Sequence, residues 1–496
     1  MYEPVKPELV IGLVGPVGSD VDAAGAEVAK ALVPYGYHVT EIRLSRLLRE
    51  AHGGEHLNEH VPEDVRIERH MDAGDELRRQ TGRNDAVAGL AVGYISDFRQ
   101  RETDGVPVDG QAYVLNSLKH PAEVQMLRRV YGARLILISV HTPASVRGAA
   151  LQKRIAETRG APERADGFAG EAEHLMVRDE RDEERDFGQN VRATFTSGDV
   201  YVASTPEREI ASGVQRYLAL YFGNPFLTPT REEYAMFHAH AAALRSADLS
   251  RQVGAVVATD RGDVIAVGCN EVPRAFGGQY WPEDEDDQRD FELGYDSNAK
   301  SKTEALERAF QALWDADQLA DGSTLQDFVA SLSGTRLANI TEFGRPVHAE
   351  MAALLDAARR GASVKDHQLV TTTFPCHNCA RHMIAAGIRE VVYREPYEKS
   401  LALSLHRDAI EVDPVEPTGN KMVVRRFVGV GPPRYFDLFT APNRKDDNGN
   451  RLPWSEEAAR PRLVVDETAY LTIEEEFLAE FSDAMKDVNL EPKEGP

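Results

Sequence analysis

Hydrophobic residues recur along this chain with two periods, one typical of helices and one typical of strands. Apolar positions repeat at helical spacing over 349–360 and 379–388, and a β-rich run, 367–374, lies between them. Upstream, a helical pattern over 231–247 is followed by two β-rich runs within 251–273, joined by an Asp-Arg-Gly-Asp turn that indicates a hairpin. These elements predict an α/β/α domain with a central mixed sheet.

The beginning of the chain shows a separate strand, loop and helix over 8–33, with glycines in the loop. When a phosphate-binding Walker A pattern is laid over it from Gly15, residues 20–22 read Asp-Val-Asp where Gly, Lys and Ser or Thr are expected. We therefore predict a P-loop kinase-like α/β domain with a degenerate Walker A motif. Gly15, Gly18 and Ser19 are its candidate nucleotide contacts, and a tight turn without a ligand is an equal alternative.

Composition narrows the class of protein and its partners. The chain of 496 residues has room for two or three domains, and its formal net charge of −24 disfavours a polynucleotide substrate. It contains no run of 18 apolar residues, and its N-terminus lacks a signal-peptide pattern. We expect a cytoplasmic protein that does not enter a membrane.

Changes in composition along the chain predict three regions. We expect a kinase-like domain over 1–222 and a second α/β domain over 228–435, the latter interrupted by an insertion at 271–345. After Arg434 the chain becomes acidic and rich in charge, which predicts an acidic C-terminal extension over 436–496.

Two short motifs supply candidate metal chemistry. His348 begins a His-Ala-Glu sequence, and Cys376 and Cys379 lie three apart after a proline. A catalytic zinc ion takes three protein ligands of these types and keeps a fourth position for water. Glu350 would then stay off the metal and be free to move protons. A structural zinc site uses similar cysteine spacing but needs a fourth ligand, and the remaining cysteine, Cys269, lies in an apolar run typical of a buried thiol.

The motifs and the hairpin before them resemble the cytidine and deoxycytidylate deaminase superfamily. This resemblance implies that Asn270, the residue after the second hairpin strand, contacts the sugar of the substrate. A turn role is the alternative for Asn270. Tyr393 and Tyr397 fall near the expected pocket rim, where they would contact base or sugar, with packing as the alternative.

The whole chain resembles the bacterial anti-phage dCTP deaminase family, in which a P-loop kinase-like domain precedes the deaminase. The segments NSLKHPAEVQMLRRVYG, GQNVRATF and CNEVPRAFGGQYW contribute to this resemblance. It implies zinc-dependent conversion of dCTP, and of dCMP, to deoxyuridine nucleotides, which would deprive an infecting phage of a DNA precursor. It also implies a homo-oligomer. Because an unrestrained dCTP deaminase would harm its own host, we further expect a regulatory nucleotide or inhibitor at the N-terminal domain.

Two other functions remain open at this point. One is a deaminase that acts on cytosine or adenine in tRNA or single-stranded DNA, which would need an electropositive groove with stacking aromatics. The other is a nucleotide-sensing module whose zinc is structural.

Overall fold

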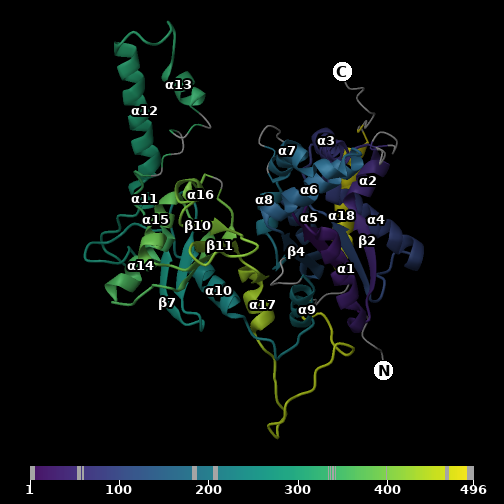
Figure 1. The fold of residues 1–496 in the computed structure, drawn as a ribbon. Coiled ribbons are helices and arrows are strands. Elements are labelled where there is room, and N and C mark those ends of the chain that lie inside the picture. The colour runs from purple at the N-terminus through teal and green to yellow at the C-terminus, as the bar shows by residue number, and fades with distance from the viewer. Residues whose placement is uncertain are drawn as a thin grey trace. The chain divides into compact units, whose positions relative to one another are not determined.

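The structure is a computed structural model that forms two compact units (Figure 1). The first unit comprises Met1–Thr230 together with Val428–Pro496, and the second comprises Arg231–Phe427. The structure describes residues 6–52, 57, 61–180, 182, 187–204, 210–332, 335, 337, 340, 342–397, 399–463, 469–486 and 488.

The first unit contains a six-stranded sheet in the order β12-β5-β4-β1-β3-β2. Every neighbouring pair is parallel except β12 with β5. Its strands are β1 (Leu9–Val14), β2 (His38–Arg43), β3 (Gln111–Asn116), β4 (Leu135–His141), β5 (Val200–Ala203) and β12 (Gly429–Val430). Its α-helices are α1 (Val21–Leu32), α2 (Leu44–Ala51), α3 (Glu63–Thr81), α4 (Ala86–Thr103), α5 (Pro121–Tyr131), α6 (Ala144–Thr158), α7 (Ala169–Glu180), α8 (Val191–Thr196), α9 (Ile210–Tyr221), α17 (Tyr435–Phe439) and α18 (Ala469–Met485).

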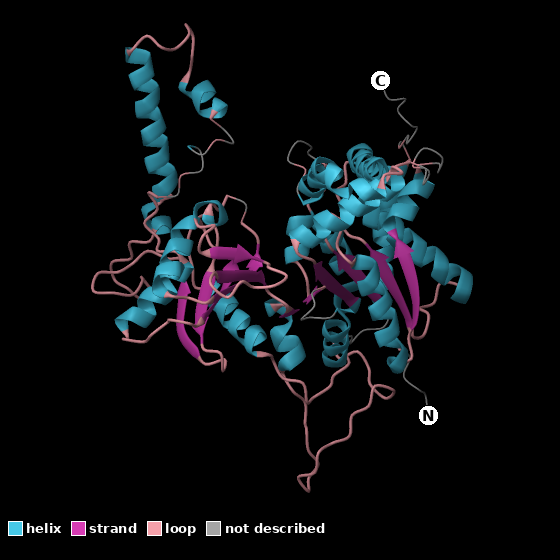
Figure 2. Ribbon diagram, in the orientation of Figure 1, coloured by secondary structure: helices cyan, strands magenta, loops and turns pink. Residues whose placement is uncertain are grey.

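Helices cover the central strands of this sheet (Figure 2), and these strands are mostly apolar. Every residue of β1 and of β4 is buried, as expected for parallel strands with both faces covered. The predicted strand, loop and helix at the start of the chain correspond to β1, the segment 15–20 and α1.

The C-terminal segment belongs to the first unit, whereas the sequence suggested a separate acidic extension. Helix α18, yellow in Figure 1, packs on α4 and α5. Phe477 and Phe481 of α18 are buried, and Arg99 of α4 forms buried ion pairs with Glu474 and Glu8 at 2.6 and 2.9 Å. Most acidic residues of the helix are exposed, whereas Glu474 is buried and paired with Arg99, and composition alone could not distinguish the two.

The second unit contains a six-stranded mixed sheet in the order β10-β11-β9-β8-β6-β7, in which β6 is antiparallel to both β7 and β8. Its strands are β6 (Gly254–Ala258), β7 (Val264–Cys269), β8 (Gln368–Thr373), β9 (Glu390–Glu395), β10 (Ile410–Val412) and β11 (Met422–Arg426). Its α-helices are α10 (Arg231–Ala243), α11 (Asp290–Leu293), α12 (Ser297–Asp315), α13 (Leu325–Ser331), α14 (Ala349–Arg359), α15 (His377–Ala386) and α16 (Ala402–Leu405).

Two glycines allow helices to lie directly on opposite faces of this sheet. A Cβ on Gly254 would lie 1.9 Å from the carbonyl oxygen of Ala239 in α10. A Cβ on Gly268 would lie 2.3 Å from the carbonyl oxygen of Ala349 in α14. Because Gly254 pairs with Cys269, the neighbour of Gly268, the two glycines face opposite sides. The sheet therefore sets the depth of α14, which begins at the candidate metal site.

The α/β class and the predicted hairpin are confirmed, with two mixed sheets. Helix α12 begins at Ser297, where the Asp296 side chain accepts a hydrogen bond from the Ala299 backbone N–H and caps the helix. Figure 1 shows α12 extending away from the rest of its unit. None of the helices in the described residues is both long and apolar enough to cross a membrane.

Candidate metal centre and active-site pocket

Three predicted ligands meet at the starts of two helices. His348 is the residue that precedes α14, and Cys376 precedes α15 and accepts a hydrogen bond from the Cys379 backbone N–H. The Nδ1 atom of His348 lies 3.2 Å from the sulfur of Cys376 and 3.4 Å from that of Cys379. One nitrogen and two sulfurs within 4.8 Å of one another could hold a metal ion.

The donor set fits zinc. Nitrogen and sulfur ligands of a tetrahedral zinc, about 2.1 and about 2.3 Å from the ion, lie roughly 3.6 Å apart. Shifts of a few tenths of an ångström would therefore bring His348, Cys376 and Cys379 to coordinating positions. Three protein ligands leave the fourth position of the ion open, which is typical of a catalytic site.

The charges of these groups also favour a cation. A hydrogen bond from the Cys379 thiol, with a further contribution from His348, lowers the pKa of Cys376 to about 4 despite burial. The hydrogen bond to Cys376 in turn raises the pKa of His348 to about 9. The Cys376 sulfur is therefore held as a thiolate at neutral pH, which is the form that binds metal.

Glu350 lies in the first turn of α14 and is buried, with 4% of its surface exposed. The Cys379 thiol donates a hydrogen bond of 3.3 Å to its Oε2. Burial raises the pKa of Glu350, and the thiolate of Cys376 raises it further, while His348 lowers it. A carboxyl group with a raised pKa next to a metal site is suited both to accept and to release a proton.

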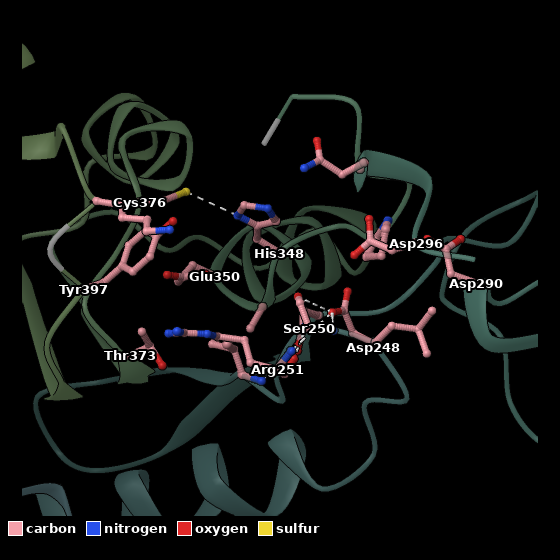
Figure 3. Close-up of a pocket in the computed structure, with 18 of the residues that line it drawn as sticks. Asp248, Ser250, Arg251, Asp290, Asp296, His348, Glu350, Thr373, Cys376 and Tyr397 are labelled. Carbon is pink, nitrogen blue, oxygen red and sulfur yellow. Dashed lines mark hydrogen bonds between the residues drawn. The ribbon is translucent and has the colours of Figure 1, made fainter. Parts of the chain in front are cut away.

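The three ligands and Glu350 adjoin a pocket of about 340 Å³. Figure 3 shows Cys376, Tyr397 and Thr373 on one side of His348, and Asp248, Asp290 and Asp296 on the other. The residues that line the pocket are Asp248, Leu249, Ser250, Arg251, Val253, Asn270, Asp290, Asp296, Ser297, Asn298, Gly344, Pro346, His348, Ala349, Glu350, Thr373, Phe374, Cys376, Tyr397 and Lys399.

Asn270 and Tyr397 line this pocket, and Tyr393 does not. The Asn270 amide donates to the carbonyl oxygen of Arg251 at 2.8 Å and accepts from the Val253 backbone N–H at 2.7 Å. It therefore holds the segment that carries Arg251. The structure differs from the sequence prediction at Tyr393. This side chain is 4% exposed in the core, and its ring packs edge-on against Phe374. We therefore remove Tyr393 from the substrate contacts.

Sequence reasoning missed the cations of the pocket and the contribution of the insertion. Arg251 and Lys399 line it, and the guanidinium of Arg251 lies 5.5 Å from the centre of the Tyr397 ring. The insertion supplies Asp290 and Asp296, together with the neighbouring Ser297 and Asn298. The position of Arg251 immediately before the hairpin was the available signal, whereas nothing local in the insertion indicates a pocket wall.

The predicted contacts in the first unit form the loop between β1 and α1. Gly15, Gly18 and Ser19 all line a second cavity, of about 280 Å³. Gly18 has a φ of +85°, and the Ser19 backbone N–H donates to the carbonyl oxygen of Pro16. The P-loop identity of this unit stays a prediction.

Comparisons with known proteins concern the second unit. Residues 229–395 match the family model described as the cytidine and deoxycytidylate deaminase zinc-binding region. The chain is 41% identical over 54 residues to the deoxycytidylate deaminase of Enterobacteria phage T4, and 25% identical over 161 residues to that of Pongo abelii. These matches cover 11% and 32% of this chain, and 28% and 62% of the relatives, so the chain spans less than two thirds of either relative.

A solved structure of dCMP deaminase from the cyanophage S-TIM5, in complex with dCMP and dUMP, is also similar. It is 20% identical, and the match covers 40% of this chain and 98% of that one with a TM-score of 0.24, which is too low to carry an inference. The family match and the His/Cys/Cys group together show that the C-terminal region contains a zinc-binding domain of the cytidine and deoxycytidylate deaminase superfamily.

Proposed function

We propose that this protein hydrolyses the 4-amino group of cytosine in deoxycytidine nucleotides, dCTP and dCMP, and releases ammonia and deoxyuridine nucleotides. The observation that carries the proposal is Glu350, a buried carboxyl group that lines the same pocket as His348 and Cys376 without being part of the His348/Cys376/Cys379 group. The family match over 229–395 supports the same chemistry.

Glu350 would move both protons of the reaction. Zinc held by His348, Cys376 and Cys379 would activate a water molecule for attack on C4 of cytosine. Glu350 would take the first proton of that water and deliver it to N3 of the ring. It would then carry the second proton to the amino group, which leaves as ammonia while the C4 carbonyl of uracil forms.

The pocket walls would bind the rest of the nucleotide. Arg251 and Lys399 are the cationic side chains among its lining residues, and they would contact the phosphates. Tyr397 would stack on or border the base, and Asn270 would contact the sugar while it fixes the backbone beside Arg251.

The test is a Glu350→Gln variant, which keeps the shape of the side chain and removes its base. We expect one zinc ion per chain and a loss of ammonia release from dCTP and dCMP by at least about 10²-fold. The exposed Glu416→Gln, in the same unit, is the matched control and should keep its activity. Near-normal ammonia release from Glu350→Gln would exclude the mechanism.

The substrate panel should include dCTP, dCMP, CTP and a cytosine-containing oligonucleotide. Activity on the oligonucleotide alone would favour a polynucleotide deaminase, and zinc binding without any deamination would favour a sensing module. Because Arg251 is assigned to phosphate, Arg251→Gln should raise KM for dCTP more than for deoxycytidine.

We also propose, from the resemblance to anti-phage dCTP deaminases, that the activity depletes dCTP in the cytoplasm during phage infection and that the protein works as a homo-oligomer. Cells that express the wild-type chain should lose dCTP after infection and yield fewer plaques than cells that express Glu350→Gln. Equal plaque counts would contradict the defensive role, and gel filtration with light scattering tests the oligomer.

A further inference from the structure

The 280 Å³ cavity of the first unit opens at the carboxyl ends of three parallel strands. Gly15 directly follows β1, Asn116 ends β3 and Arg43 ends β2, and all three residues line the cavity. From β1 the chain continues to β2 on one side of the sheet, and from β3 it continues to β4 on the other. Open α/β sheets bind ligands at this point, where connections diverge.

Cationic side chains gather at this cavity. Its lining includes five cationic side chains, from Arg43, Arg66, Arg78, Lys119 and Arg154, and three carboxylates, from Asp22, Glu63 and Asp179. The chain as a whole carries a formal charge of −24. Each of these cations is ion-paired, as Lys119 is with Asp179 and Arg154 is with Glu63. An anionic ligand would therefore have to compete with a carboxylate for them.

Lys119 brings an ammonium group to the loop that lacks the Walker lysine. It enters from the segment after β3, and its Nζ lies 3.3 Å from the carbonyl oxygen of Gly15 and 2.8 Å from Oδ1 of Asp179. The other carboxylate oxygen of Asp179 accepts a hydrogen bond from the Val17 backbone N–H at 2.6 Å. The buried carboxylate of Asp179 thus binds a backbone N–H of the loop and the ammonium group of Lys119. Both are groups that also bind phosphate.

Buried polar atoms without partners point to a ligand independently of the loop. Gln189 lines the cavity with 7% of its surface exposed, and its Oε1 has no hydrogen-bond partner among the described residues. The same holds for Nε of Arg78, which is 1% exposed. Such atoms cost free energy unless something binds them.

Part of the lining is apolar and suits a flat group. Leu48, Ile67, Met71 and Val87 line the cavity, and Ile67 and Met71 belong to the same apolar cluster as Val17 of the glycine loop. Apolar side chains with a few hydrogen-bonding groups suit the base of a nucleotide, and the glycine loop with its lysine suits the phosphate.

We propose that this cavity binds a nucleoside phosphate, with its phosphate at the Gly15–Ser19 loop, Lys119 and Arg154, and that Asp179 competes with the phosphate for Lys119 and the Val17 N–H. This site lies in the first unit and does not depend on the deaminase chemistry of the second. It replaces the missing Walker lysine with a lysine about a hundred positions later in the chain.

The experiment is calorimetric titration of the full chain with TMP, TTP, AMP and ATP, with thymidine, adenosine and inorganic phosphate as comparison ligands. None of these contains cytosine, so the outcome is separate from that of the deamination test. We expect saturable binding of at least one nucleotide and at least tenfold weaker binding of its nucleoside.

Three substitutions and one control test the assigned groups. Lys119→Gln and Arg154→Gln should each weaken binding about tenfold, and Asp179→Asn should strengthen it because the neutral amide no longer pairs with Lys119. Lys153→Gln removes an exposed charge beside Arg154 that does not line the cavity, and it should leave binding unchanged.

The Arg154 variant separates an effect on nucleotide binding from an effect on protein stability. Arg154 is partly exposed, with 46% of its side chain accessible, so its substitution leaves the folded protein available for titration even where Lys119 or Asp179 variants unfold. The proposal is overturned if no nucleotide binds saturably up to millimolar concentration. It is also overturned if folded Arg154→Gln binds as tightly as Lys153→Gln.

Discussion

The close approach of α14 to β7 makes Gly268→Ala a sensitive test of how the metal site is positioned. The added Cβ would lie 2.3 Å from the carbonyl oxygen of Ala349 and 2.4 Å from the backbone nitrogen of Ala353, both backbone atoms of α14. Ordinary contact begins near 3.4 Å, so the helix has to move away by roughly 1 Å. Since His348 immediately precedes α14 and Glu350 lies in its first turn, both groups move with it.

Two quantities should change. Forced overpacking of this kind costs about 1–3 kcal/mol of stability. A displacement of about 1 Å in catalytic groups lowers turnover by about 10²-fold. We expect Gly268→Ala to lower the melting temperature and, in the fraction that stays folded, to reduce zinc content and ammonia release. The measurements are thermal unfolding, elemental analysis and the deamination rate per folded chain.

The matched control is Gly254→Ala, on the neighbouring strand. Its Cβ would meet α10 on the opposite face, 1.9 Å from the carbonyl oxygen of Ala239, so it should destabilise the unit without moving α14 directly. Gly170→Ala, which meets nothing within 4 Å, should be neutral. A folded Gly268→Ala protein with wild-type zinc content and turnover would refute the reasoning, as would equal loss of turnover in folded Gly254→Ala.

Three further predictions concern the metal, the first unit and pH. Cys379→Ala should lower bound zinc well below one ion per chain by elemental analysis and abolish deamination, and full zinc occupancy would contradict the assignment. Arg99→Met leaves the buried carboxylates of Glu8 and Glu474 without their cation, so the free energy of urea unfolding of the first unit should fall by about 3–5 kcal/mol, and an unchanged midpoint would exclude a stabilising role. Burial lowers the pKa of His120 to about 4, below its ordinary 6.5, so the unfolded chain binds more protons between these values. The stability from this group is therefore complete above about pH 6.5 and is lost as the pH falls toward 4, and His120→Asn should flatten that part of the profile measured by thermal unfolding.

The metal ligands could be found from sequence because their chemistry is local. His348 and Glu350 are two positions apart, Cys376 and Cys379 three apart, and each pair lies at a predicted helix start that the structure contains. Tyr393 could not be placed in this way, because a strand alternates its side chains between two faces and the sequence did not indicate which face holds the pocket.

Hydrophobic periodicity and short motifs could not predict contacts between segments that lie far apart in the sequence. Lys119 and Asp179 meet the glycine loop from 104 and 162 positions away, and their roles follow only from the arrangement of the sheet. The pocket wall formed by Asp290 and Asp296 likewise depends on how the insertion folds back on the hairpin.

The return of the chain to its first unit has a consequence for biosynthesis. β12 and α18 are translated after the whole second unit, about 200 residues later than residue 230. At about 5–20 residues per second, the ribosome needs roughly 10–40 s to cover that interval. During this time the second unit can acquire its core while the first unit still lacks an edge strand and a covering helix. A chain that ended before β12 would therefore contain the whole second unit and an incomplete first unit.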